Sequence, residues 1–519
     1  MDLVTPETMQ QMDRRTIDDV GVPGPVLMDR AARGAVDALL AHYSVPEQAA
    51  IGIVCGTGNN GGDGLAMATM LAHRGYEPRV VVLGDGDSLS DDAALYYKIA
   101  QQLVDHLVVA DSDDGLADAL ADQPDCAVWC DGLLGTGIDR PVEGRYATAV
   151  QFLDDQPAPV VAIDIPSGVE GTSGQVLGIA ADAELTVTFG CAKIGQCLEP
   201  GRSVCGQLEV VDIGIPQHVR EEVGIAATGL DRRWLSNRVS RRPANIHKGS
   251  VGTTLHVGGR PSTAGAIAMS ARAALVGGAG LITVATDRRS QAVIPTATPE
   301  IMSRDLFDFD VGNFDENALR EAVDGADSIV IGPGLGTDHT ARGIVDTVFG
   351  AVDAHNVIVD ADALNLVASD DELAEALSQC SDDASVVLTP HPGEMARLQK
   401  REIADVLSDP VDAARRLSDR FQAISILKTA TSIVADADGQ LAINRTGNPG
   451  MATGGMGDAL TGLIAAAFAD HGDGFDAACQ ATAIHGHAAD RAVESTGHRG
   501  LTVQRLLDEV PAVWHALQG

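Results

Sequence analysis

Short runs of β-branched residues alternate with helical runs along most of this 519-residue chain, and this alternation restricts its fold more than any other feature. Strands that alternate with helical segments of ordinary length predict parallel sheets joined by crossover helices. The sequence therefore predicts an α/β protein. The first series of expected strands covers 51–56, 78–84, 106–110, 126–132, 160–166, 185–190 and 208–214. The second series covers 253–259, 281–286, 328–336, 356–367, 385–394 and 424–436.

The chain is too long for a single hydrophobic core, so at least two domains are expected. The segment 216–240 is polar and lacks strand periodicity, which places the junction there. We expect a first domain over 1–218, a linker over 219–240 and a second domain over 241–519. Helices of the first domain are expected over 64–75, 90–104, 114–121 and 144–155, after a helical prelude over 1–44.

A glycine-rich stretch, Thr446–Gly462 (TGNPGMATGGMGDALTG), leads directly into a helix of small residues. Glycine lets the backbone turn and lets N–H groups approach a ligand closely. The free N–H groups and the positive end of the helix dipole favour an anion in this loop. Asp458 stands at the junction, where it is either the helix N-cap or a catalytic base. Because a cap alone does not require such a loop, the pattern favours phosphoryl chemistry with Asp458 as the base.

The first half has a glycine loop of its own. Gly56–Gly61 matches the GxGxxG pattern between a strand and a helix, which is the context of a dinucleotide-binding turn. Asp85 follows the next strand, where a ribose-binding acid would stand, and this pattern alone would support an NAD-dependent dehydrogenase. However, Asn59, Asn60 and Asp63 are unusual in a simple pyrophosphate turn. Amide oxygens can bind a hard cation or form hydrogen bonds with sugar and phosphate.

Two further polar loops follow expected strands of the first half, DGLLGTG from Asp131 and DIPSG from Asp164. In doubly wound sheets a ligand lies beyond the carboxyl ends of the strands. We therefore expect Asn60, Asp131, Asp164 and Ser167 to converge. A loop cap explains any one of these aspartates, whereas three glycine-flanked strand ends together favour one ligand site.

The motifs GNNGGDG, DGLLGTG and DIPSG resemble the NAD(P)H-hydrate epimerase family, which has a Rossmann-like, doubly wound fold. The resemblance implies that Asp164 is a substrate-contacting acid/base. It also implies a potassium ion (K⁺) held by Asn60, Asp131 and Ser167. The substrate-binding residues that it implies are Asn59, Asn60, Gly61, Gly62, Asp63, Gly135, Thr136, Gly137, Ile138, Asp139, Arg140, Pro141 and Asp164.

The second half resembles the partner family, NAD(P)H-hydrate dehydratase, which has a ribokinase-like fold. The resemblance covers almost all of 245–490 and includes GPGLG, VDADALNL, HPGE and GGMGD. In that family a nucleotide phosphorylates the C6 hydroxyl of the substrate, and loss of phosphate regenerates the dihydronicotinamide. The expected metal is Mg²⁺. The implied substrate residues are Ala266, Gly334, His391 and Asp458. The implied nucleotide residues are Lys428, Thr429, Ala430, Thr431, Ser432 and Gly457, with Thr429 in place of the family's common glycine.

Together the two halves resemble a bifunctional nicotinamide-nucleotide repair enzyme. The resemblance implies that the first half interconverts the R and S hydrates of NADH and NADPH (NADHX and NADPHX). It implies that the second half dehydrates the S form with ADP, and ADP rather than ATP is inferred from the prokaryotic character of the fusion. One alternative is a ribokinase-type kinase for a vitamin precursor with an accessory Rossmann-like domain. Another is a first half that is a nucleotide-sensing or protein-binding module rather than an enzyme. A homo-oligomer, a tetramer or larger, is also expected.

The formal net charge of −37 arises from 73 acidic and 36 basic residues, and only five of the basic residues are lysines. So acidic a surface argues against nucleic acid or an anionic membrane as a partner. Acidic residues spread along the chain, with scarce lysine, suggest a halophilic prokaryote, where salt screens the self-repulsion. The cysteines form no CxxC pattern, no apolar run reaches transmembrane length and the N-terminus is acidic. These features predict a protein of the reducing cytoplasm.

The charge predicts that salt stabilises the fold. Raising KCl from about 0.01 M to about 1 M shortens the Debye length roughly tenfold. The melting temperature should rise, because repulsion between surface carboxylates is then screened. Melting curves followed by circular dichroism at both salt concentrations measure this effect. A melting temperature that does not change with KCl would contradict the predicted adaptation to salt.

Overall fold

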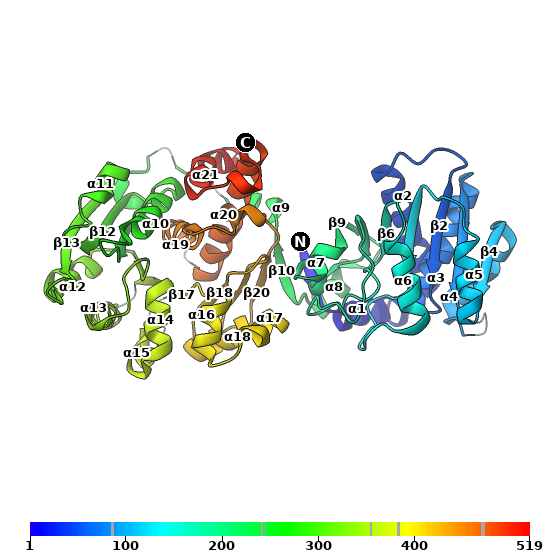
Figure 1. Ribbon diagram of the computed structural model, residues 1–519, viewed down its shortest axis with the longest axis horizontal. Coiled ribbons are helices and arrows are strands. Elements are labelled where there is room, and N and C mark those ends of the chain that lie inside the picture. The colour runs from blue at the N-terminus through cyan, green and yellow to red at the C-terminus, as the bar shows by residue number, and fades with distance from the viewer. Residues whose placement is uncertain are drawn as a thin grey trace. The chain divides into compact units, whose positions relative to one another are not determined.

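The structure, a computed structural model, describes residues 1–84, 88–239, 242–243, 245–352, 355–380, 385–468 and 473–518. It divides into two units, Asp2–Ala227 and Thr228–Gly519, and each unit contains a largely parallel sheet covered by helices (Figure 1). The α/β prediction is therefore confirmed.

The segment 219–240, predicted as a linker, contains regular structure. It holds the end of helix α8 (Gln217–Val223), strand β10 (Ala227–Leu230) and helix α9 (Arg232–Ser236). The expectation that this segment lacks a strand was wrong, because β10 pairs with β20 (Leu441–Asn444), which is distant in the sequence. The local pattern of apolar and polar residues predicts a strand poorly when the strand depends on a partner that is distant in the sequence.

The N-terminal unit is built on a seven-stranded parallel sheet. Strand β2 comes first in the chain and lies in the middle, with β3 and β4 on one side and the later strands on the other. The strand order therefore reverses between β2 and β5, which is where doubly wound sheets bind ligands. In sheet order the strands are β4 (His106–Ala110), β3 (Glu77–Leu83), β2 (Ala50–Cys55), β5 (Val128–Gly132), β6 (Val160–Ile163), β7 (Leu185–Phe189) and β9 (Gln207–Val211).

Alternate residues of this sheet pack against two helical layers. In β2, Ile51 and Ile53 belong to one buried cluster and Val54 belongs to another. Successive side chains of a strand point to opposite faces of the sheet. Burial of the side chains on both faces is typical of a parallel strand covered by helices on both sides. The first layer contains α1 (Pro6–Asp18), α2 (Gly24–His42), α3 (Asn59–His73) and α4 (Asp91–Leu103), and the second contains α5 (Asp113–Ala121) and α6 (Gly144–Asp154).

Helix α3 begins earlier than the predicted start at residue 64, so residues 59–63 form its first turn rather than a free loop. Glycine allows this turn to lie close to the end of β2. A Cβ atom added at Gly61 would stand 1.9 Å from the carbonyl oxygen of Gly56. The N–H groups of a first helical turn have no acceptor within the helix. The turn therefore presents hydrogen-bond donors at the carboxyl end of the sheet.

The sheet of the C-terminal unit is parallel at its centre and antiparallel near its edges. The run expected as one strand over 424–436 is a hairpin of β18 and β19, and β13 and β20 were not predicted. In sheet order the strands are β14 (Asn313–Phe314), β13 (Met302–Asp308), β12 (Leu281–Asp287), β11 (Thr253–Val257), β15 (Ser328–Ile331), β16 (Asn356–Val359), β17 (Val386–Leu388), β18 (Ile424–Leu427), β19 (Ile433–Ala435), β20 and β10.

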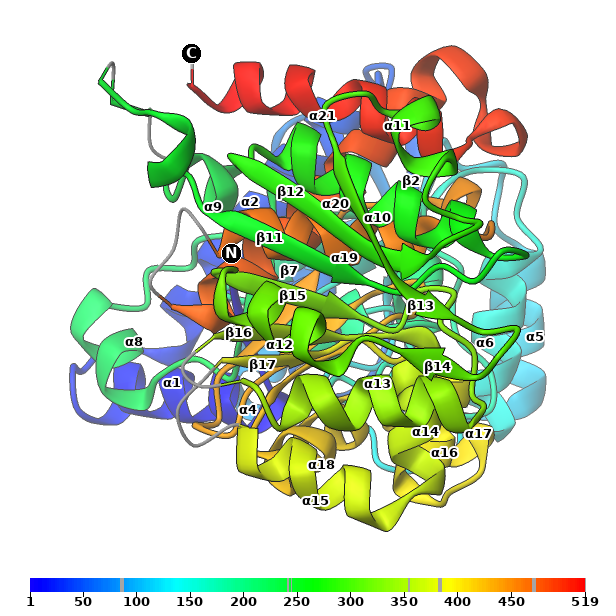
Figure 2. The ribbon, with the colours of Figure 1, turned by 90° about the vertical axis from the view of Figure 1, so that its left-hand side faces the viewer.

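Helices cover both faces of this second sheet, as Figures 1 and 2 show from two directions. One layer contains α10 (Ala264–Gly277), α19 (Met456–Ala467), α20 (Gly474–Thr496) and α21 (Val503–Gln518). The other contains α12 (Glu316–Asp324), α13 (His339–Phe349), α14 (Ala361–Ser369), α15 (Asp371–Cys380), α16 (Pro392–Gln399), α17 (Ile403–Ser408) and α18 (Pro410–Phe421). The short helix α11 (Val293–Ala297) follows β12.

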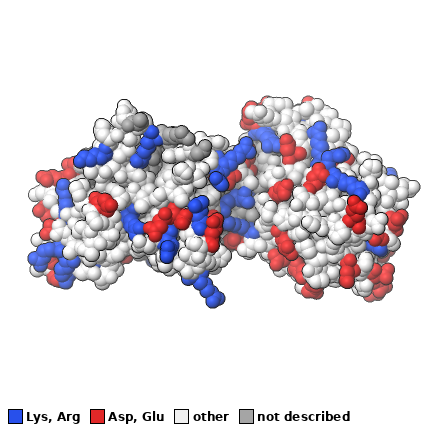
Figure 3. Space-filling model, turned by 90° about the horizontal axis from the view of Figure 1, so that it is seen from above, with Lys and Arg blue, Asp and Glu red and all other residues white. Residues whose placement is uncertain are grey.

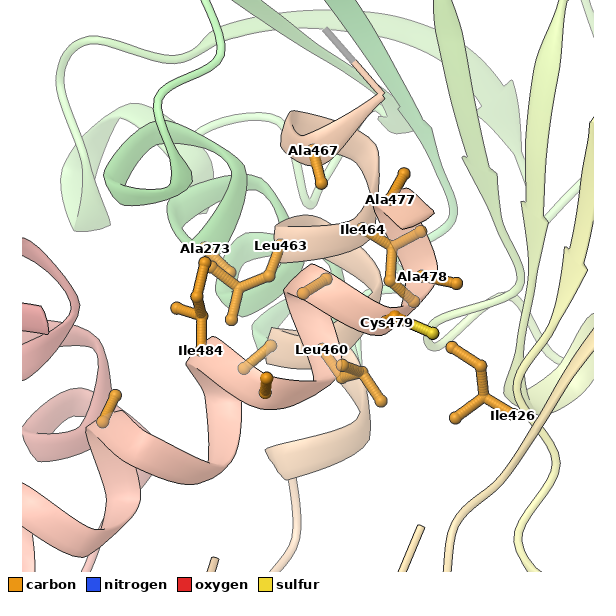
Figure 4. Packing of buried hydrophobic residues seen from close by; sticks show 14 of the residues in the cluster. Ala273, Ile426, Leu460, Leu463, Ile464, Ala467, Ala477, Ala478, Cys479 and Ile484 are labelled. Carbon is orange, nitrogen blue, oxygen red and sulfur yellow. The ribbon is translucent and has the colours of Figure 1, made fainter. Parts of the chain in front are cut away.

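Helices α10 and α19 pack unusually closely because both are rich in small residues. A Cβ atom added at Gly462 would stand 1.9 Å from the carbonyl oxygen of Ser270. Figure 4 shows Leu463 of α19 beside Ala273 of α10. The buried hydroxyl groups of Ser270 and Thr461 also form a hydrogen bond of 2.9 Å between the two helices. Close packing and one polar contact together fix how α19 lies against α10.

Both acidic and basic side chains are scattered over the face of the protein that Figure 3 shows. All eight cysteines are buried and reduced. Among the described residues, no helix combines the length and the apolar character that a membrane span requires.

The contact between α10 and α19 predicts that Gly462→Ala destabilises the C-terminal unit. The added methyl group has no space, and overpacking of this kind costs about 1–3 kcal/mol of unfolding free energy. Chemical denaturation in high salt measures the loss. Gly265→Ala, in α10 with open space around its Cβ position, is the control and should be neutral or stabilising. Equal stability of the two variants would contradict the close packing.

Two candidate active sites

The N-terminal unit contains a cavity of about 520 Å³ at the carboxyl end of its sheet. It lies at the reversal of strand order between β2 and β5. Seven of the predicted substrate residues and Asp164 line it, whereas Gly61, Gly62, Asp139, Arg140 and Pro141 do not. The lining members of the predicted set are Asn59, Asn60, Asp63, Gly135, Thr136, Gly137, Ile138 and Asp164. Asp85 lies outside the described residues.

A buried hydrogen-bond network joins two of the strand ends. Asp131 is fully buried, and its carboxylate accepts hydrogen bonds from the Ser167 hydroxyl at 2.6 Å and the Ser167 N–H at 2.7 Å. Burial raises the pKa of Asp131 to about 6, although these hydrogen bonds oppose the rise. Asn60 donates from Nδ2 to the carbonyl oxygen of Leu134 at 2.9 Å. Its Oδ1 atom is buried and has no partner among the described residues, so it is available to a cation.

Asp164 follows β6 in a backbone conformation that only a few non-glycine residues adopt, with φ at +63°. Its Oδ1 atom accepts hydrogen bonds from the Lys193 ammonium, from the Thr188 hydroxyl at 3.0 Å and from the Phe189 N–H at 3.1 Å. Strained backbone of this kind is concentrated at functional sites. The geometry supports Asp164 as the reactive carboxylate of the cavity, with Lys193 as its counter-ion.

Three more carboxyl groups line the same cavity: Asp13 from α1, Asp63 from α3 and Asp92 from α4. Burial raises the pKa of Asp63 well above its ordinary value, and the negative charges of Asp164 and Asp13 raise it further. Burial also raises the pKa of Asp13 to about 6. The cavity lining therefore holds four carboxyl groups and one ammonium, which suits proton transfer.

In the C-terminal unit, Asp458 lies in the first turn of α19 and does not cap it. The helix begins at Met456, and Gly455 precedes it with φ at +94°, so the N-cap explanation of Asp458 is wrong. Among the described residues, none donates a hydrogen bond to the Asp458 carboxylate. Burial raises the pKa of Asp458 to about 7, and the nearby Asp360 adds to the rise. A half-buried, unpaired carboxyl group at a helix N-terminus is suited to act as a base.

Lys428 lies beside this helix terminus. Its ammonium donates a hydrogen bond of 2.7 Å to Asp360, and a Cβ atom added at Gly457 would stand 3.0 Å from its Nζ atom. Burial lowers the pKa of Lys428, but Asp360 and Glu394 outweigh burial and raise it overall. The lysine is therefore a charged group beside the first N–H groups of α19. A cation and unpaired N–H groups therefore lie together at the place where the glycine loop predicts an anion.

His391 and Glu394 flank Lys428. The ring Nδ1 atom of His391 accepts a hydrogen bond of 3.0 Å from the Gly393 N–H, which caps α16, and half of the side chain stays exposed. Glu394 is buried, and burial raises its pKa to about 7. The cap explains why a histidine suits this turn, and its exposed ring edge remains available to a substrate.

The other predicted residues lie around the same helix ends. Gly334 has φ at +62°, and its carbonyl oxygen accepts a hydrogen bond of 2.9 Å from Thr263, the residue before α10. Ala266 lies in the first turn of α10. The α10 residue Met269 contacts Gly455, which connects this turn to the start of α19. Thr429, Ala430, Thr431 and Ser432 form the turn between β18 and β19, directly after Lys428.

Sequence reasoning missed four charged residues: Asp13, Lys193, Asp360 and Glu394. Asp360 and Glu394 stand inside the motifs VDADALNL and HPGE, so the rule that ligands lie beyond strand ends was enough to find them. Lys193 gives a weaker signal, although it is one of only five lysines in the chain. Asp13 gives none, because α1 reaches the cavity through tertiary packing.

Both halves of the chain are similar to known proteins. Residues 24–195 match the family described as YjeF-related protein N-terminus, and residues 254–512 match NAD(P)H-hydrate dehydratase. The whole chain is 37% identical to the bifunctional NAD(P)H-hydrate repair enzyme Nnr of Moorella thermoacetica and covers 97% of it. The chain belongs to the bifunctional NAD(P)H-hydrate repair enzyme family. Its relative from Escherichia coli, also a bifunctional NAD(P)H-hydrate repair enzyme Nnr, is 32% identical over 97% of this chain and 93% of its own length.

A solved structure of the ADP/ATP-dependent NAD(P)H-hydrate dehydratase from Bacillus subtilis, co-crystallised with ATP and Mg²⁺, is similar to part of this repair enzyme. It is 25% identical, with a TM-score of 0.48, and the similarity covers 57% of this chain and 100% of that one.

The buried ion pair in the epimerase-like unit predicts that Lys193→Met is strongly destabilising. The side chain of Lys193 is 1% exposed and that of Asp164 is 16% exposed, so the substitution leaves a largely buried carboxylate without its cation. Loss of one partner of such a pair costs about 3–5 kcal/mol. Chemical denaturation measures this cost. The double variant Lys193→Met, Asp164→Asn should recover part of it, and Lys98→Met, at an exposed position, should change little. A stable Lys193→Met variant would contradict the ion pair.

Proposed function

We propose that the N-terminal unit interconverts the R and S hydrates of NADH and NADPH. We propose that the C-terminal unit dehydrates the S form with ADP, which becomes AMP and phosphate. The observation that carries the proposal is the C-terminal site. An unpaired Asp458 carboxyl group there lies at a helix N-terminus beside the charged Lys428. This arrangement can bind a phosphate and accept a hydroxyl proton at the same place.

The chemistry of dehydration accounts for both features. Hydroxide is a poor leaving group, and phosphorylation converts the C6 hydroxyl into a good one. Asp458 accepts the hydroxyl proton while the C6 oxygen attacks the β-phosphorus of ADP, and the bond from that phosphorus to the AMP oxygen breaks. Lys428 and the N–H groups at the start of α19 stabilise the phosphoryl charge. The C6–O bond then breaks with loss of phosphate, and loss of a proton from C5 restores the dihydronicotinamide.

The surroundings of Asp458 suit a magnesium ion that arrives with the nucleotide. Asp360, Glu394 and Asp458 place three carboxyl groups around the single ammonium of Lys428. In the described part of the chain, no three acidic, histidine or cysteine side chains converge closely enough to form a complete metal site. Mg²⁺ is commonly held by one or two carboxylates together with substrate phosphates, and it neutralises their charge. We propose Asp360 and Glu394 as the carboxylates that would hold it.

In the N-terminal unit, Asp164 is proposed as the acid/base that contacts the hydrate. Asn59, Asn60, Asp63 and the loop from Gly135 are proposed to bind it, since they line the cavity. The unpartnered Oδ1 of Asn60 and the carboxylate and hydroxyl oxygens of Asp131 and Ser167 fit a hard, weakly charged cation such as K⁺. Such an ion would hold the loops after β5 and β6 in place.

We also propose that the enzyme is cytoplasmic, is adapted to high salt and forms a homo-oligomer. The buried, reduced thiols support the cytoplasmic location, and the excess of acidic residues supports the adaptation to salt. The oligomeric state stays a prediction from the resemblance.

The direct test follows the near-ultraviolet absorbance of reduced nicotinamide after purified protein is mixed with hydrated NADH and either ADP or ATP. Recovery of absorbance with ADP is the expected result, and release of AMP should match it. A stable phosphorylated product would identify a ribokinase-type kinase instead. No recovery with either nucleotide would end the dehydratase proposal.

Replacement of Asp458, the proposed base, should remove the dehydratase activity and leave the epimerase activity. Asp458→Asn should slow dehydration of the S hydrate by at least about 10²–10⁴-fold, while the interconversion of epimers continues. In the unsubstituted enzyme, kcat should rise with pH and level off above about pH 7, because the base must be ionised and burial raises its pKa to about 7.

The matched control is Asp476→Asn, since Asp476 occupies the corresponding position in the first turn of α20. It should leave both activities unchanged. Full dehydratase activity in the Asp458→Asn variant would exclude Asp458 as the base.

A further inference from the structure

A carboxyl group on α1 lines the N-terminal cavity and stands apart from the predicted site. Asp13 faces the same cavity as Asp164 and Lys193. Helix α1 reaches it because strand β1 (Asp2–Val4), which precedes α1, pairs in parallel with β8 (Ala192–Lys193). In that pairing Val4 is opposite Lys193. The fold therefore brings Asp13 to the Asp164–Lys193 pair from a distant part of the sequence.

Asp13 has no hydrogen-bond donor among the described residues around it. Its Oδ1 atom is buried and unpartnered. The ammonium of Lys193 cannot supply the missing hydrogen bond, since it has only three protons. They are directed to Asp164 Oδ1, to Thr188 Oγ1 at 2.9 Å and to the carbonyl oxygen of Phe189 at 3.3 Å.

The surroundings of the two carboxyl groups differ in kind. Apolar side chains line the cavity beside the acidic ones: Met9 and Ile17, one turn before and one turn after Asp13 on α1, and Leu27 and Met28 on α2. Burial raises the pKa of Asp13 to about 6; Lys193 opposes this rise and Asp164 adds to it. The other titratable groups that face Asp13 are Asp63 on α3 and the thiol of Cys191. By contrast, the Asp164 carboxylate is stabilised by an ammonium, a hydroxyl and an N–H group.

We propose that Asp13 is a second catalytic residue of the epimerase, the acid that protonates the departing C6 hydroxyl while Asp164 acts as the base. The proposal rests on the epimerase function proposed above. Two carboxyl groups in one cavity, one in apolar surroundings and one in a hydrogen-bonded site, are the arrangement that separates acid from base in other enzymes.

The reaction balances with water as the only co-reactant. C6 of the hydrate carries both the hydroxyl and the ring nitrogen N1. Asp13 gives its proton to the hydroxyl, the C6–O bond breaks with release of water, and the N1 lone pair forms an N1=C6 double bond. A water molecule then adds to the opposite face of C6, and its proton passes to Asp164. The reverse reaction runs through the same steps with the two roles exchanged, so the pair always holds one proton.

The experiment measures interconversion of the purified R hydrate by the full chain without nucleotide, with chromatographic separation of the epimers. Asp13→Asn should lower kcat by about 10²–10⁴-fold. In the unsubstituted enzyme, kcat/KM should fall as pH rises above about 6, because Asp13 then loses its proton. The variant should lack this fall, and Asp13→Glu should restore part of the rate and the fall with it.

Two controls separate catalysis from folding. Dehydration of the S hydrate with ADP should be unchanged in Asp13→Asn, and Asp18→Asn, at the exposed end of α1, should epimerise at the unsubstituted rate. An unchanged rate in Asp13→Asn, or a lower rate with the same pH dependence, would overturn the role of Asp13 and leave the epimerase function intact. An unsubstituted chain that does not interconvert the epimers would overturn both.

Discussion

The close approach of α10 and α19 is the contact on which the C-terminal site depends. Gly462 removes the atom that would collide with the Ser270 carbonyl, and the hydrogen bond from Ser270 to Thr461 fixes the two helices along their length. Thr461 in turn donates a hydrogen bond of 2.7 Å to the backbone carbonyl of Asp458. The position of the proposed base is therefore set by buried packing one turn further along its own helix.

Both sites use a scarce residue in the same way. Only five lysines occur in the chain, and two of them, Lys193 and Lys428, are largely buried and paired with an aspartate in a candidate site. In each site several carboxyl groups surround one ammonium, so not all of them can be ionised at little cost. This excess of carboxyl groups supplies groups that titrate near neutral pH, which is what proton transfer in either reaction needs.

Sequence reasoning found the features that repeat locally. The alternation of strands and helices gave the α/β class, and the polar strand ends gave Asn60, Asp131, Asp164 and Ser167, which the structure brings to one edge of the sheet. What it missed depends on distant partners. Strand β10 exists through its pairing with β20, and Asp13 reaches the cavity through the pairing of β1 with β8. The start of α3 was predicted too late, because its first turn contains glycines and glycine is unfavourable in helices.

The central claim is that each unit performs one half of a repair reaction. It is tested most directly by mixing two variants that each lack one activity with purified R hydrate and ADP. Asp164→Ala lacks the epimerase activity, and Asp458→Asn lacks the dehydratase activity. Neither variant alone should restore the absorbance of reduced nicotinamide faster than the hydrate epimerises without enzyme. The mixture should restore it completely, because one chain supplies the S epimer and the other dehydrates it. Failure of the mixture, or recovery with either variant alone at the rate of the mixture, would contradict the division of labour between the two units.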